Sequence, residues 1–438
     1  MSENHSPLQL PPLSLYVHIP WCVRKCPYCD FNSHQVAAGA NSHQVAAGAN
    51  SHSVAAGAHQ ASAGANSHEA AGPHSSEYGL PEVAYVAQLR RDLASQLPWV
   101  QGRKLQSIFF GGGTPSLFSP AAIGQILEVA EGAVGFAPDI EITLEANPGT
   151  FEQEKFSGYR AAGVNRLSIG VQSFDPRQLA NLGRIHSGHE AAAALGMARR
   201  AGFDNINLDL MHGLPEQTEE EALADLRRAV SLEPEHISWY QLTIEPNTAF
   251  YSAPPVTPGS KLIASMQGSG RDYLAARGYA RYEVSAYSGA GLESRHNLNY
   301  WAFGDYLGIG AGAHGKVTLP DEGRILRSRR TRAPRHYLPT AAGAGENLIH
   351  SELAPPHCDE IEREDLPLEF LMNALRLVEG VPLDTFSRYT GLPLSALERQ
   401  WPALQAMELV RPLERRIAAS AFGFDYLDEI LQRFLEQP

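Results

Sequence analysis

The chain has 438 residues, and its 35 Lys and Arg against 48 Asp and Glu give a formal net charge of -13 at pH 7. This acidic balance argues against a nucleic-acid-binding protein. A hydrophobic fraction of 43% and a charged fraction of 19% are typical of a globular protein of about two or three domains. No run of about 18 apolar residues could span a bilayer, and the first residues show no secretion signal, so we expect a cytosolic protein.

A short apolar segment, Leu13 to Ile19, indicates a buried strand, and a cysteine-rich loop follows it. Three of the four cysteines lie in this loop: Cys22, Cys26 and Cys29. Three thiolates can hold three irons of a [4Fe-4S] cube and leave the fourth iron open to an external chelator. The number of cysteines also argues against a disulfide framework. We therefore interpret the loop as the site of a catalytic iron–sulfur cluster.

A structural zinc site of the Cys3His type is the alternative interpretation, with His18 or His34 as the fourth ligand. Structural zinc sites usually combine two separated ligand pairs, which this loop lacks, so the cluster is the favoured interpretation. Cys358 stands alone in the sequence and is interpreted as an ordinary core or surface thiol.

Residues 32–74 contain almost no large apolar side chains and repeat a nine-residue unit, Asn-Ser-His-Gln-Val-Ala-Ala-Gly-Ala, from residue 32 and again from residue 41. Such a segment cannot form a core, so we predict a flexible insertion over residues 33–75. Its histidines are His34, His43, His52, His59, His68 and His74. Capture of a metal or of heme is one role for them, but an incidental linker is the favoured interpretation.

Beyond the insertion, strand and helix signals alternate. The predicted helices are 81–97, Pro120 to Glu131 with Ser119 as its N-cap, Ala191 to Ala201 and Thr218 to Leu232. The predicted strands are Gln106 to Phe110, Ile140 to Glu145, Asn165 to Val171, Asn205 to Leu210 and His236 to Thr243. Repeated β-α units imply a parallel sheet, either an open doubly wound sheet or an arc of a barrel.

The pattern changes in the last part of the chain. Tyr279 to Ser285 is predicted to add an antiparallel strand. From residue 359 onward, compact helices are predicted at Leu366 to Leu377, Pro382 to Thr390, Leu394 to Leu404 and Phe424 to Phe434. These helices indicate a small, mostly helical C-terminal domain of winged-helix type.

Polar groups follow the ends of the predicted strands, where ligands of α/β proteins collect. The segments are Gly111-Gly-Gly-Thr-Pro-Ser116, Glu145-Ala-Asn-Pro-Gly149, Gln172-Ser-Phe-Asp175 and Asp209-Leu-Met-His-Gly-Leu-Pro215, with Arg184 and His186 in a further loop. A buried carboxylate at such a position needs a partner, which an amino-acid ammonium or ribose hydroxyls would supply. The alternative is that these residues cap helices or pair with one another.

Three motifs in combination carry a family resemblance. They are Leu15-Tyr-Val-His-Ile-Pro-Trp-Cys-Val-Arg-Lys-Cys-Pro-Tyr-Cys-Asp-Phe31, Phe109-Phe-Gly-Gly-Gly-Thr-Pro-Ser116 and Ser294-Arg-His-Asn-Leu-Asn-Tyr-Trp301. The chain resembles the radical SAM superfamily, and within it the HemN/HemW branch, over nearly its whole length except residues 33 to about 75. The resemblance implies a partial (β/α)6 barrel with a HemN-type C-terminal domain.

The resemblance also implies the cofactors. A [4Fe-4S] cluster would be held by Cys22, Cys26 and Cys29, with S-adenosylmethionine (SAM) chelating its open iron. Reduction of the cluster would cleave the sulfonium into methionine and a 5′-deoxyadenosyl radical. The positions that match SAM-lining residues of the family are Tyr16, Gly112, Gly113, Thr114, Glu145, Gln172, Arg184 and Asp209, and Tyr28 is placed beside the cluster.

Two departures separate the chain from the coproporphyrinogen oxidases of this branch. Those enzymes carry a further cysteine two residues after the third cluster cysteine, where this chain has Phe31, and a longer N-terminal extension. Both departures favour the HemW subfamily of heme chaperones, whose His-Asn-x-x-Tyr motif is matched by His296, Asn297 and Tyr300. His296 would supply an imidazole to heme iron, and Asn297 and Tyr300 would orient it or meet a propionate. The alternative is a His-Asn turn that hydrogen-bonds its own backbone.

A basic run stands out in this acidic chain: Arg324, Arg327, Arg329, Arg330, Arg332 and Arg335. Arginine forks suit carboxylates, so porphyrin propionates or an acidic partner are candidate ligands. A solvated face that pairs with the chain's own Asp and Glu is the favoured interpretation.

The expected domains are an N-terminal tail (1–12), the partial barrel (13–250), a barrel extension with the His-Asn-x-x-Tyr motif (251–350) and the C-terminal domain (359–438). The resemblance implies a heme chaperone that transfers heme to respiratory hemoproteins, with peripheral contact at the membrane. An oxygen-independent coproporphyrinogen III oxidase is the alternative, and radical SAM chemistry on an unrelated substrate is a third. The oligomeric state is left open, with a dimer as one option.

Overall fold

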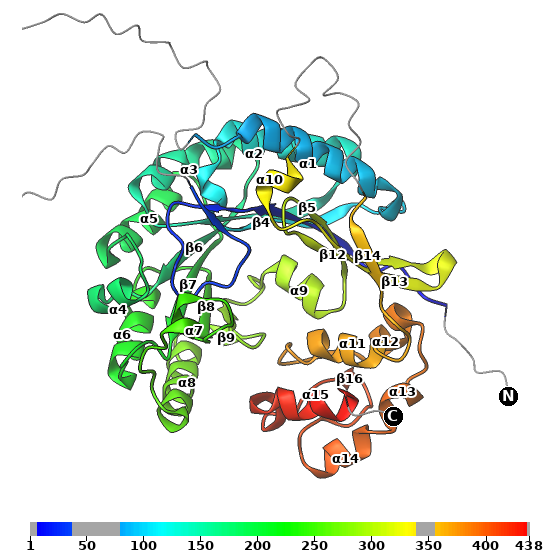
Figure 1. Ribbon diagram of the computed structural model, residues 1–438. Helices are drawn as coiled ribbons and strands as arrows, with labels where there is room; N and C mark the ends of the chain where they lie inside the picture. Colours follow the sequence, from blue (N-terminus) through cyan, green and yellow to red (C-terminus); the bar gives the residue numbers. More distant parts are fainter. Residues whose placement is uncertain (1–6, 37–78, 339–354, 436–438) are drawn as a thin grey trace, which may run out of the picture.

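The computed structural model describes residues 7–36, 79–338 and 355–435, and Figure 1 shows them arranged around one strongly curved sheet. This sheet has 12 strands in the order β14-β13-β12-β11-β1-β4-β5-β6-β7-β8-β10-β9. Its parallel strands are β11 (Asp305–Ile309), β1 (Leu13–Ile19), β4 (Leu105–Gly112), β5 (Phe136–Ala146), β6 (Arg166–Gln172), β7 (Ile206–His212) and β8 (His236–Gln241). The six parallel strands predicted from the sequence are therefore confirmed.

The sheet extends further than the sequence indicated. β11 pairs with β1 in parallel, and β12 (His314–Leu319), β13 (Arg324–Arg329) and β14 (His357–Glu360) continue it antiparallel. At the other edge, β10 (Ala286–Ser288) and β9 (Ala280–Arg281) replace the single strand predicted over Tyr279 to Ser285. The chain turns between these two short strands because Glu283 to Ser285 form a bend closed by the Arg281 side chain.

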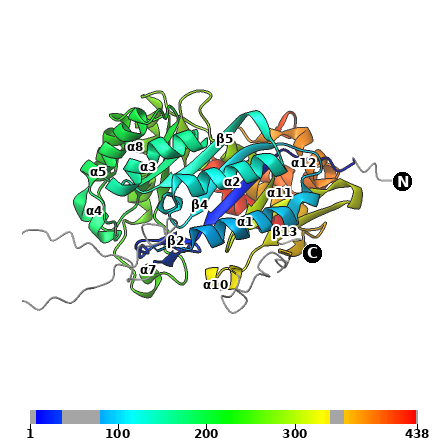
Figure 2. The same ribbon diagram turned by 90° about the horizontal axis from the view of Figure 1, so that it is seen from above.

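An outer layer of helices covers the convex face of the sheet, as the view from above shows (Figure 2). It contains α1 (Glu82–Gln96), α2 (Pro120–Ala133), α3 (Thr150–Ala162), α4 (Pro176–Asn181), α5 (Gly188–Arg200), α6 (Glu219–Val230) and α8 (Ser260–Ala275). Ser119 caps α2 as predicted, and its hydroxyl accepts from the backbone N–H of Ala122. Between these helices and the sheet lies the main core, in which β1 buries Leu13, Leu15 and Val17 completely.

A short helix, α9 (Arg295–Trp301), lies on the concave side of the sheet, and the C-terminal helices lie beyond it (Figure 1). These are α11 (Leu366–Ala374), α12 (Leu383–Thr390), α13 (Ser395–Glu398), α14 (Trp401–Ala406) and α15 (Leu427–Leu435), with a two-stranded sheet of β15 (Val381–Pro382) and β16 (Arg416–Ile417). They enclose a second core around Phe370, Phe386 and Trp401. The helix predicted over Leu394 to Leu404 is interrupted, because Pro402 begins a new helix instead of continuing the old one.

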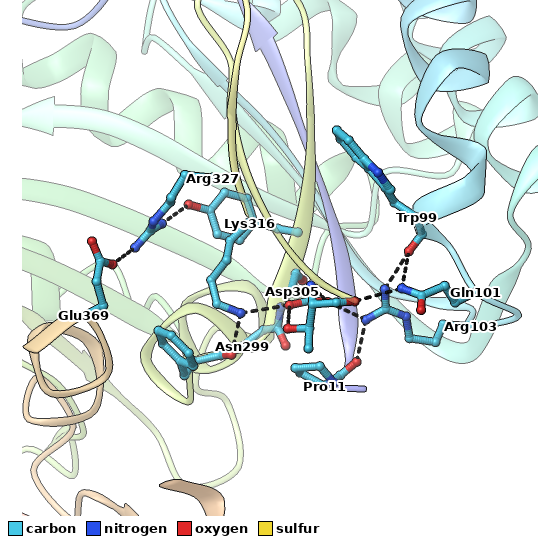
Figure 3. A network of polar contacts seen from close by, with 12 residues as sticks. Pro11, Trp99, Gln101, Arg103, Asn299, Asp305, Lys316, Arg327 and Glu369 are labelled. Carbon is cyan, nitrogen blue, oxygen red and sulfur yellow. Dashed lines mark hydrogen bonds and ion pairs between the residues drawn. The ribbon is translucent and has the colours of Figure 1, made fainter. Parts of the chain in front are cut away.

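A buried charge network joins α9, strands β11 and β12 of the sheet, and the loop that leads into β4 (Figure 3). Asp305 at the start of β11 accepts from Lys316 at 2.8 Å and from Arg103 at 2.7 Å. The side chain of Lys316 is only 2% exposed. Arg327 on β13 donates to the hydroxyl of Tyr306 and forms an ion pair with Glu369 on α11, which ties the sheet to the C-terminal helices.

The described part of the predicted insertion belongs to the cysteine loop. Residues 34 and 35 form β3 (His34–Gln35), which pairs in parallel with β2 (Trp21–Cys22), and the Ser33 side chain is buried. The rest of the insertion lies within residues 37–78, outside the described residues. Its flexibility and the role of its other histidines therefore remain predictions. None of the helices in the described ranges is long and apolar enough to cross a membrane.

Candidate functional site

A cavity of about 360 Å³ opens at the carboxyl ends of the parallel strands. This volume is within the range of small-molecule sites. Residues predicted for the cluster and for SAM line it together: Cys22, Cys26, Tyr28, Cys29, Gly112, Gly113, Thr114, Glu145, Gln172, Arg184 and Asp209. The other lining residues are Arg24, Phe31, Ser33, Ala146, Asn147, Ser168, Gly170 and Tyr240. Segments that are far apart in the sequence thus meet at one site.

The three thiols are free and only partly exposed at the mouth of this cavity. Thr114 donates from its hydroxyl to the sulfur of Cys22 at 3.5 Å, and Arg184 lies 3.7 Å from the sulfur of Cys26. Burial raises the pKa of Cys22 and of Cys29. Iron–sulfur ligation requires thiolates, so the hydrogen bonds and the positive charge would favour the form that binds iron.

The two histidines of the zinc alternative are engaged elsewhere. His18 contacts the Tyr16 hydroxyl through Nδ1 at 3.0 Å and the Asn32 carbonyl through Nε2 at 2.9 Å. His34 contacts the carbonyl of Arg332. Within the described ranges, no three His, Cys, Asp or Glu side chains converge as they would around a single metal ion. Three thiols that line one cavity suit a cube, in which each thiolate binds a different iron.

The glycines of the Gly111-Gly-Gly-Thr turn are required by close packing at the cavity wall. A Cβ atom on Gly113 would lie 2.5 Å from the backbone oxygen of Trp21, which begins the cysteine loop. Gly112 has a φ of 112°, and a Cβ atom there would lie 2.4 Å from the His18 ring. Only residues without a side chain allow this turn to contact the cysteine loop so closely.

Arg184 is a partly buried cation that connects three walls of the cavity. Its guanidinium donates to the carbonyl of Gly170 at 2.6 Å and to the side-chain oxygen of Asn147 at 2.7 Å. Asn147 in turn donates to the Thr114 hydroxyl at 3.1 Å. Asn147 was not among the predicted SAM-binding residues, although its place just after β5 is the signal that identifies it.

Two carboxyl groups lie at the floor of the cavity. Burial, and secondarily the charge of Asp209, raise the pKa of Glu145 to about 8. Burial also raises the pKa of Asp209, which accepts from Ser168 at 2.8 Å and from Asn207 at 2.9 Å. The charge of Arg166 offsets the effect of burial on Asp209 only in part, so the two acids stay costly to ionise and this floor favours a ligand that brings positive charge or hydroxyl donors.

Gln172 adopts an unusual backbone conformation where β6 ends. Its φ is 67°, and the pairing of β6 with β7 shifts register between Gly170 and Gln172. The bulge turns the Gln172 side chain toward the cavity, where its oxygen accepts from the Tyr240 hydroxyl at 2.7 Å. Such strain concentrates at functional sites. Tyr240 itself was not predicted, because an aromatic residue in a strand looks like an ordinary core residue.

Tyr16 is near the site but is not part of the cavity lining. Its ring stacks on Phe109, and its hydroxyl contacts His18. Burial, with a smaller contribution from the charge of Glu145, raises the pKa of Tyr16. Tyr16 therefore lies beside the cavity on the interior face of β1, in contact with the residues around the Gly111 turn.

The His-Asn-x-x-Tyr motif lies on α9, below this cavity and outside its lining. His296 is 5% exposed, and its Nδ1 lies 2.9 Å from the hydroxyl of Ser107 on β4. Its ring packs between Phe109 and Tyr300. Burial, with a contribution from Arg166, lowers the pKa of His296 to about 3, so the ring is neutral near pH 7. A neutral imidazole with Nδ1 held is a chemically competent metal ligand through Nε2.

The other motif residues lie on neighbouring faces of α9. Tyr300 stacks on Tyr306 with ring centroids 4.1 Å apart, and the side chain of Asn297 lies 3.5 Å from the Tyr282 hydroxyl. The His296 side chain contacts Ser107 rather than its own backbone, in contrast to the alternative of a locally bonded turn. The structure thus places the motif in the barrel interior, separate from the cysteines.

Four arginines of the basic run pair with the chain's own acidic residues, as the favoured interpretation predicts, but Arg330 is buried rather than solvated and Arg335 contacts His336. The ion pairs are Arg324 with Glu322 and Glu360, Arg327 with Glu369, Arg329 with Asp359, and Arg330 with the buried Asp92. His186, by contrast, lies outside the cavity lining, and its Nε2 contacts the carbonyl of Val171 at 3.1 Å. Cys358 is an exposed thiol on β14, as expected.

Comparison with known proteins agrees with this arrangement. The family model for the radical SAM superfamily matches residues 16–229, and that for the HemN C-terminal domain matches residues 361–424. A heme chaperone HemW from Haemophilus influenzae is 44% identical over 434 residues, covering 98% of this chain and 99% of that protein. The Escherichia coli heme chaperone HemW is also 44% identical, over 430 residues, with 98% and 100% coverage. The chain belongs to the HemW family of radical SAM proteins.

A mouse protein named radical S-adenosyl methionine domain-containing protein 1, mitochondrial, is 32% identical over 97% of this chain and 87% of its own length. Among solved structures, the coproporphyrinogen III oxidase HemN from Escherichia coli superimposes with a TM-score of 0.70 over 98% of this chain and 91% of that chain. At 21% identity this match shows a shared fold. In this HemW-family chain, Phe31 is 64% exposed and lies at the cavity.

Proposed function

We propose that this chain is a heme chaperone of the cytosol, which holds a [4Fe-4S] cluster with SAM, binds heme and transfers it to respiratory hemoproteins. The observation that carries the proposal is the 44% identity, over nearly the full length, with two proteins named heme chaperones. Its acceptors would lie at the membrane, which the protein would contact peripherally.

The residues of the cavity have distinct roles in this proposal. Cys22, Cys26 and Cys29 would hold the cluster, which when reduced supplies an electron to the SAM sulfonium. The floor carboxyls Glu145 and Asp209 would receive the cationic and hydroxyl groups of SAM. Arg184 and Asn147 would keep the strand ends in place around the ligand, since both already bridge the cavity walls.

Heme binding would involve α9. The Nε2 atom of His296 is the proposed iron ligand, because Nδ1 is committed to Ser107. The ring is buried between two aromatic side chains, so iron ligation requires α9 to shift or the adjoining C-terminal helices to open. A heme site that opens only after a conformational change suits a chaperone, which must release its heme, better than it suits a protein that holds heme permanently.

A true enzyme is the second candidate. The shared fold with coproporphyrinogen III oxidase favours it, and so does the cavity lining, which contains every polar residue expected around SAM except Tyr16. In that case a radical derived from SAM would abstract a hydrogen atom from a porphyrinogen propionate side chain, the carboxyl group would leave as CO2, and the remaining electron would pass to a one-electron acceptor, so that a vinyl group is formed. The oxidase and the chaperone differ in whether the porphyrin is changed.

The test uses the full chain with its cluster reconstituted anaerobically. Heme is titrated and followed by the Soret band in the wild type, in His296→Ala and in His357→Ala as an exposed control, while coproporphyrinogen III turnover is assayed with SAM and reductant. Stoichiometric heme binding without turnover, lost only in His296→Ala, is the expected result. Turnover without stable heme binding would replace the chaperone by the oxidase.

A further inference from the structure

Arg166 is a buried arginine for which the structure offers almost no partner. It begins β6, is 2% exposed, and its one hydrogen bond is a long contact of 3.5 Å from Nη1 to the Thr143 hydroxyl. Its Nε atom is buried without an acceptor, and the side chain makes no ion pair with any described residue. An unpaired buried guanidinium is costly, so such a group calls for an anionic partner.

The position of the guanidinium follows from the alternation of side chains along the strands. Ser168, Gly170 and Gln172 of β6 all line the cavity, so Arg166 lies on the same face one step deeper. Thr143, its contact, faces the same interior as Glu145 on β5. The charge of Arg166 lowers the pKa of His296 and of His236. The guanidinium therefore lies between the cavity floor and α9.

The acidic groups of the surrounding strands are already engaged. Asp209 accepts from Ser168 and Asn207, and Glu141 accepts from the backbone N–H groups of Arg295 and His296. Within the described ranges neither carboxylate forms an ion pair with Arg166, which contacts the Thr143 hydroxyl instead, although the charge of Arg166 does lower the pKa of Asp209. The guanidinium thus lacks a direct acidic partner, and its Nε–H donor remains available for a group that comes from outside the protein.

From these observations we infer that Arg166 binds a carboxylate of a ligand lodged between the SAM cavity and α9. The planar fork of arginine is suited to carboxylates, which it can hold through two parallel hydrogen bonds. Two ligands of the proposed function carry one: heme through its propionates, and SAM through its methionine moiety. The inference rests on that proposed function, and the two sources differ in which ligand loses affinity when Arg166 is replaced.

The experiment compares heme with heme dimethyl ester, whose propionates are blocked, on the reconstituted full chain. Soret titrations are made with the wild type, Arg166→Gln, Arg166→Lys and the control Arg160→Gln, which removes an exposed arginine of α3. SAM affinity is measured on the same four proteins by equilibrium dialysis. Circular dichroism and the thermal midpoint establish that each variant is folded, and Arg166→Lys keeps the charge if the glutamine variant does not fold.

If Arg166 holds a propionate, the wild type prefers heme to its ester by about 10- to 100-fold, and Arg166→Gln removes that preference while ester binding is unchanged. If Arg166 holds the SAM carboxylate, Arg166→Gln lowers the affinity for SAM by a similar factor and leaves the preference for heme over its ester unchanged. Unchanged heme preference together with unchanged SAM affinity in Arg166→Gln would overturn the inference and leave the chaperone proposal intact. Absence of heme binding in the wild type would instead refute the chaperone.

Discussion

The carboxylate of Glu141 accepts a hydrogen bond from the backbone N–H of His296 at 3.1 Å, and thereby anchors the first turn of α9 to β5. Its other oxygen accepts from the N–H of Arg295 at 3.0 Å. A strand of the barrel thus supplies the negative charge that a helix N-terminus favours, and it does so directly at the motif histidine.

Replacing Glu141 is expected to loosen this helix. Glu141→Gln removes the charge but keeps the shape, so we expect a loss of about 1–2 kcal/mol in the free energy of unfolding and faster hydrogen exchange over residues 295–301. Asp139→Asn is the control, because its pair with Arg295 is exposed and contributes little. Equal effects of the two variants in urea denaturation and exchange would contradict the anchoring role.

The cluster assignment separates the cysteines into two groups. Cys22→Ser, Cys26→Ser and Cys29→Ser are each expected to abolish or strongly reduce iron and sulfide incorporation, because the cube needs all three thiolates. Cys358→Ser is expected to incorporate iron like the wild type, since this thiol is exposed on β14. Iron and acid-labile sulfide are counted after anaerobic reconstitution. Full iron content in a loop variant would argue against the assigned ligands.

SAM binding is expected to depend on pH through Glu145. The pKa of this carboxyl is raised from 4.5 to about 8 in the ligand-free protein, mainly by burial. The folded chain then holds a proton that the unfolded chain has lost, so the stability of the ligand-free protein falls as pH rises from 4.5 to about 8. A cationic ligand displaces that proton, so SAM affinity rises by up to about tenfold per pH unit below the pKa.

Calorimetric titrations over this pH range measure the effect. Glu145→Gln is the control. The amine of SAM titrates in the same way with this variant, but the variant lacks the carboxyl group of Glu145 at the cavity floor. A flat difference between wild type and variant across the range would show that Glu145 does not ionise on binding.

Two glycine substitutions are expected to act in opposite directions. Gly113→Ala would drive a Cβ atom to 2.5 Å from the Trp21 backbone, so we expect a destabilisation of several kcal/mol or loss of the cluster. Gly132→Ala in α2 meets nothing within 4 Å and should stabilise the chain by about 0.5–1 kcal/mol. Denaturant midpoints of the two variants provide the comparison. A tolerated Gly113→Ala would mean that the turn and the cysteine loop can move apart.

The buried pair of Lys316 and Asp305 is expected to be sensitive to loss of one partner. Lys316→Met leaves the Asp305 carboxylate with only Arg103 as a cationic partner, so we expect a loss of about 3–5 kcal/mol. Burial tends to raise the pKa of Asp305, but Lys316 and Arg103 hold it below its usual value. The stability from this pair is therefore present near neutral pH and is lost as the solution becomes acidic. Urea titrations at pH 7 and at acidic pH measure it, and an effect below about 1 kcal/mol would contradict this account.

The parts of the fold that could be predicted from the sequence are those determined by short, local segments of the chain. The apolar runs of β1 and β4 to β8 are bounded by turn residues, and each run alone indicates a strand. β11 has only five residues, and its place beside β1 depends on tertiary pairing between Leu13 and Asp305. β13 could not be recognised, because its arginines find their acidic partners on β14 and α11, far along the chain.

The same distinction holds for the site. Glu145, Gln172 and Asp209 follow from the rule that ligands gather at strand ends, and the structure brings them to one cavity. The motif residues on α9 could be predicted only from the family resemblance, because a helix of seven residues without apolar periodicity gives no local signal. Arg166 could not be predicted as a site residue, since the first residue of a strand normally lies near the surface.

The parallel pairing of β1 with both β4 and β11 has a consequence for how the chain is made. Because β1 is synthesised first and β11 much later, one side of β1 has no strand to pair with until residue 305 has left the ribosome. Pairings that close such long loops form slowly, and an open strand edge invites association with other chains. A chain truncated before β11 is thus expected to aggregate during synthesis, even though every residue that lines the cavity has already been made.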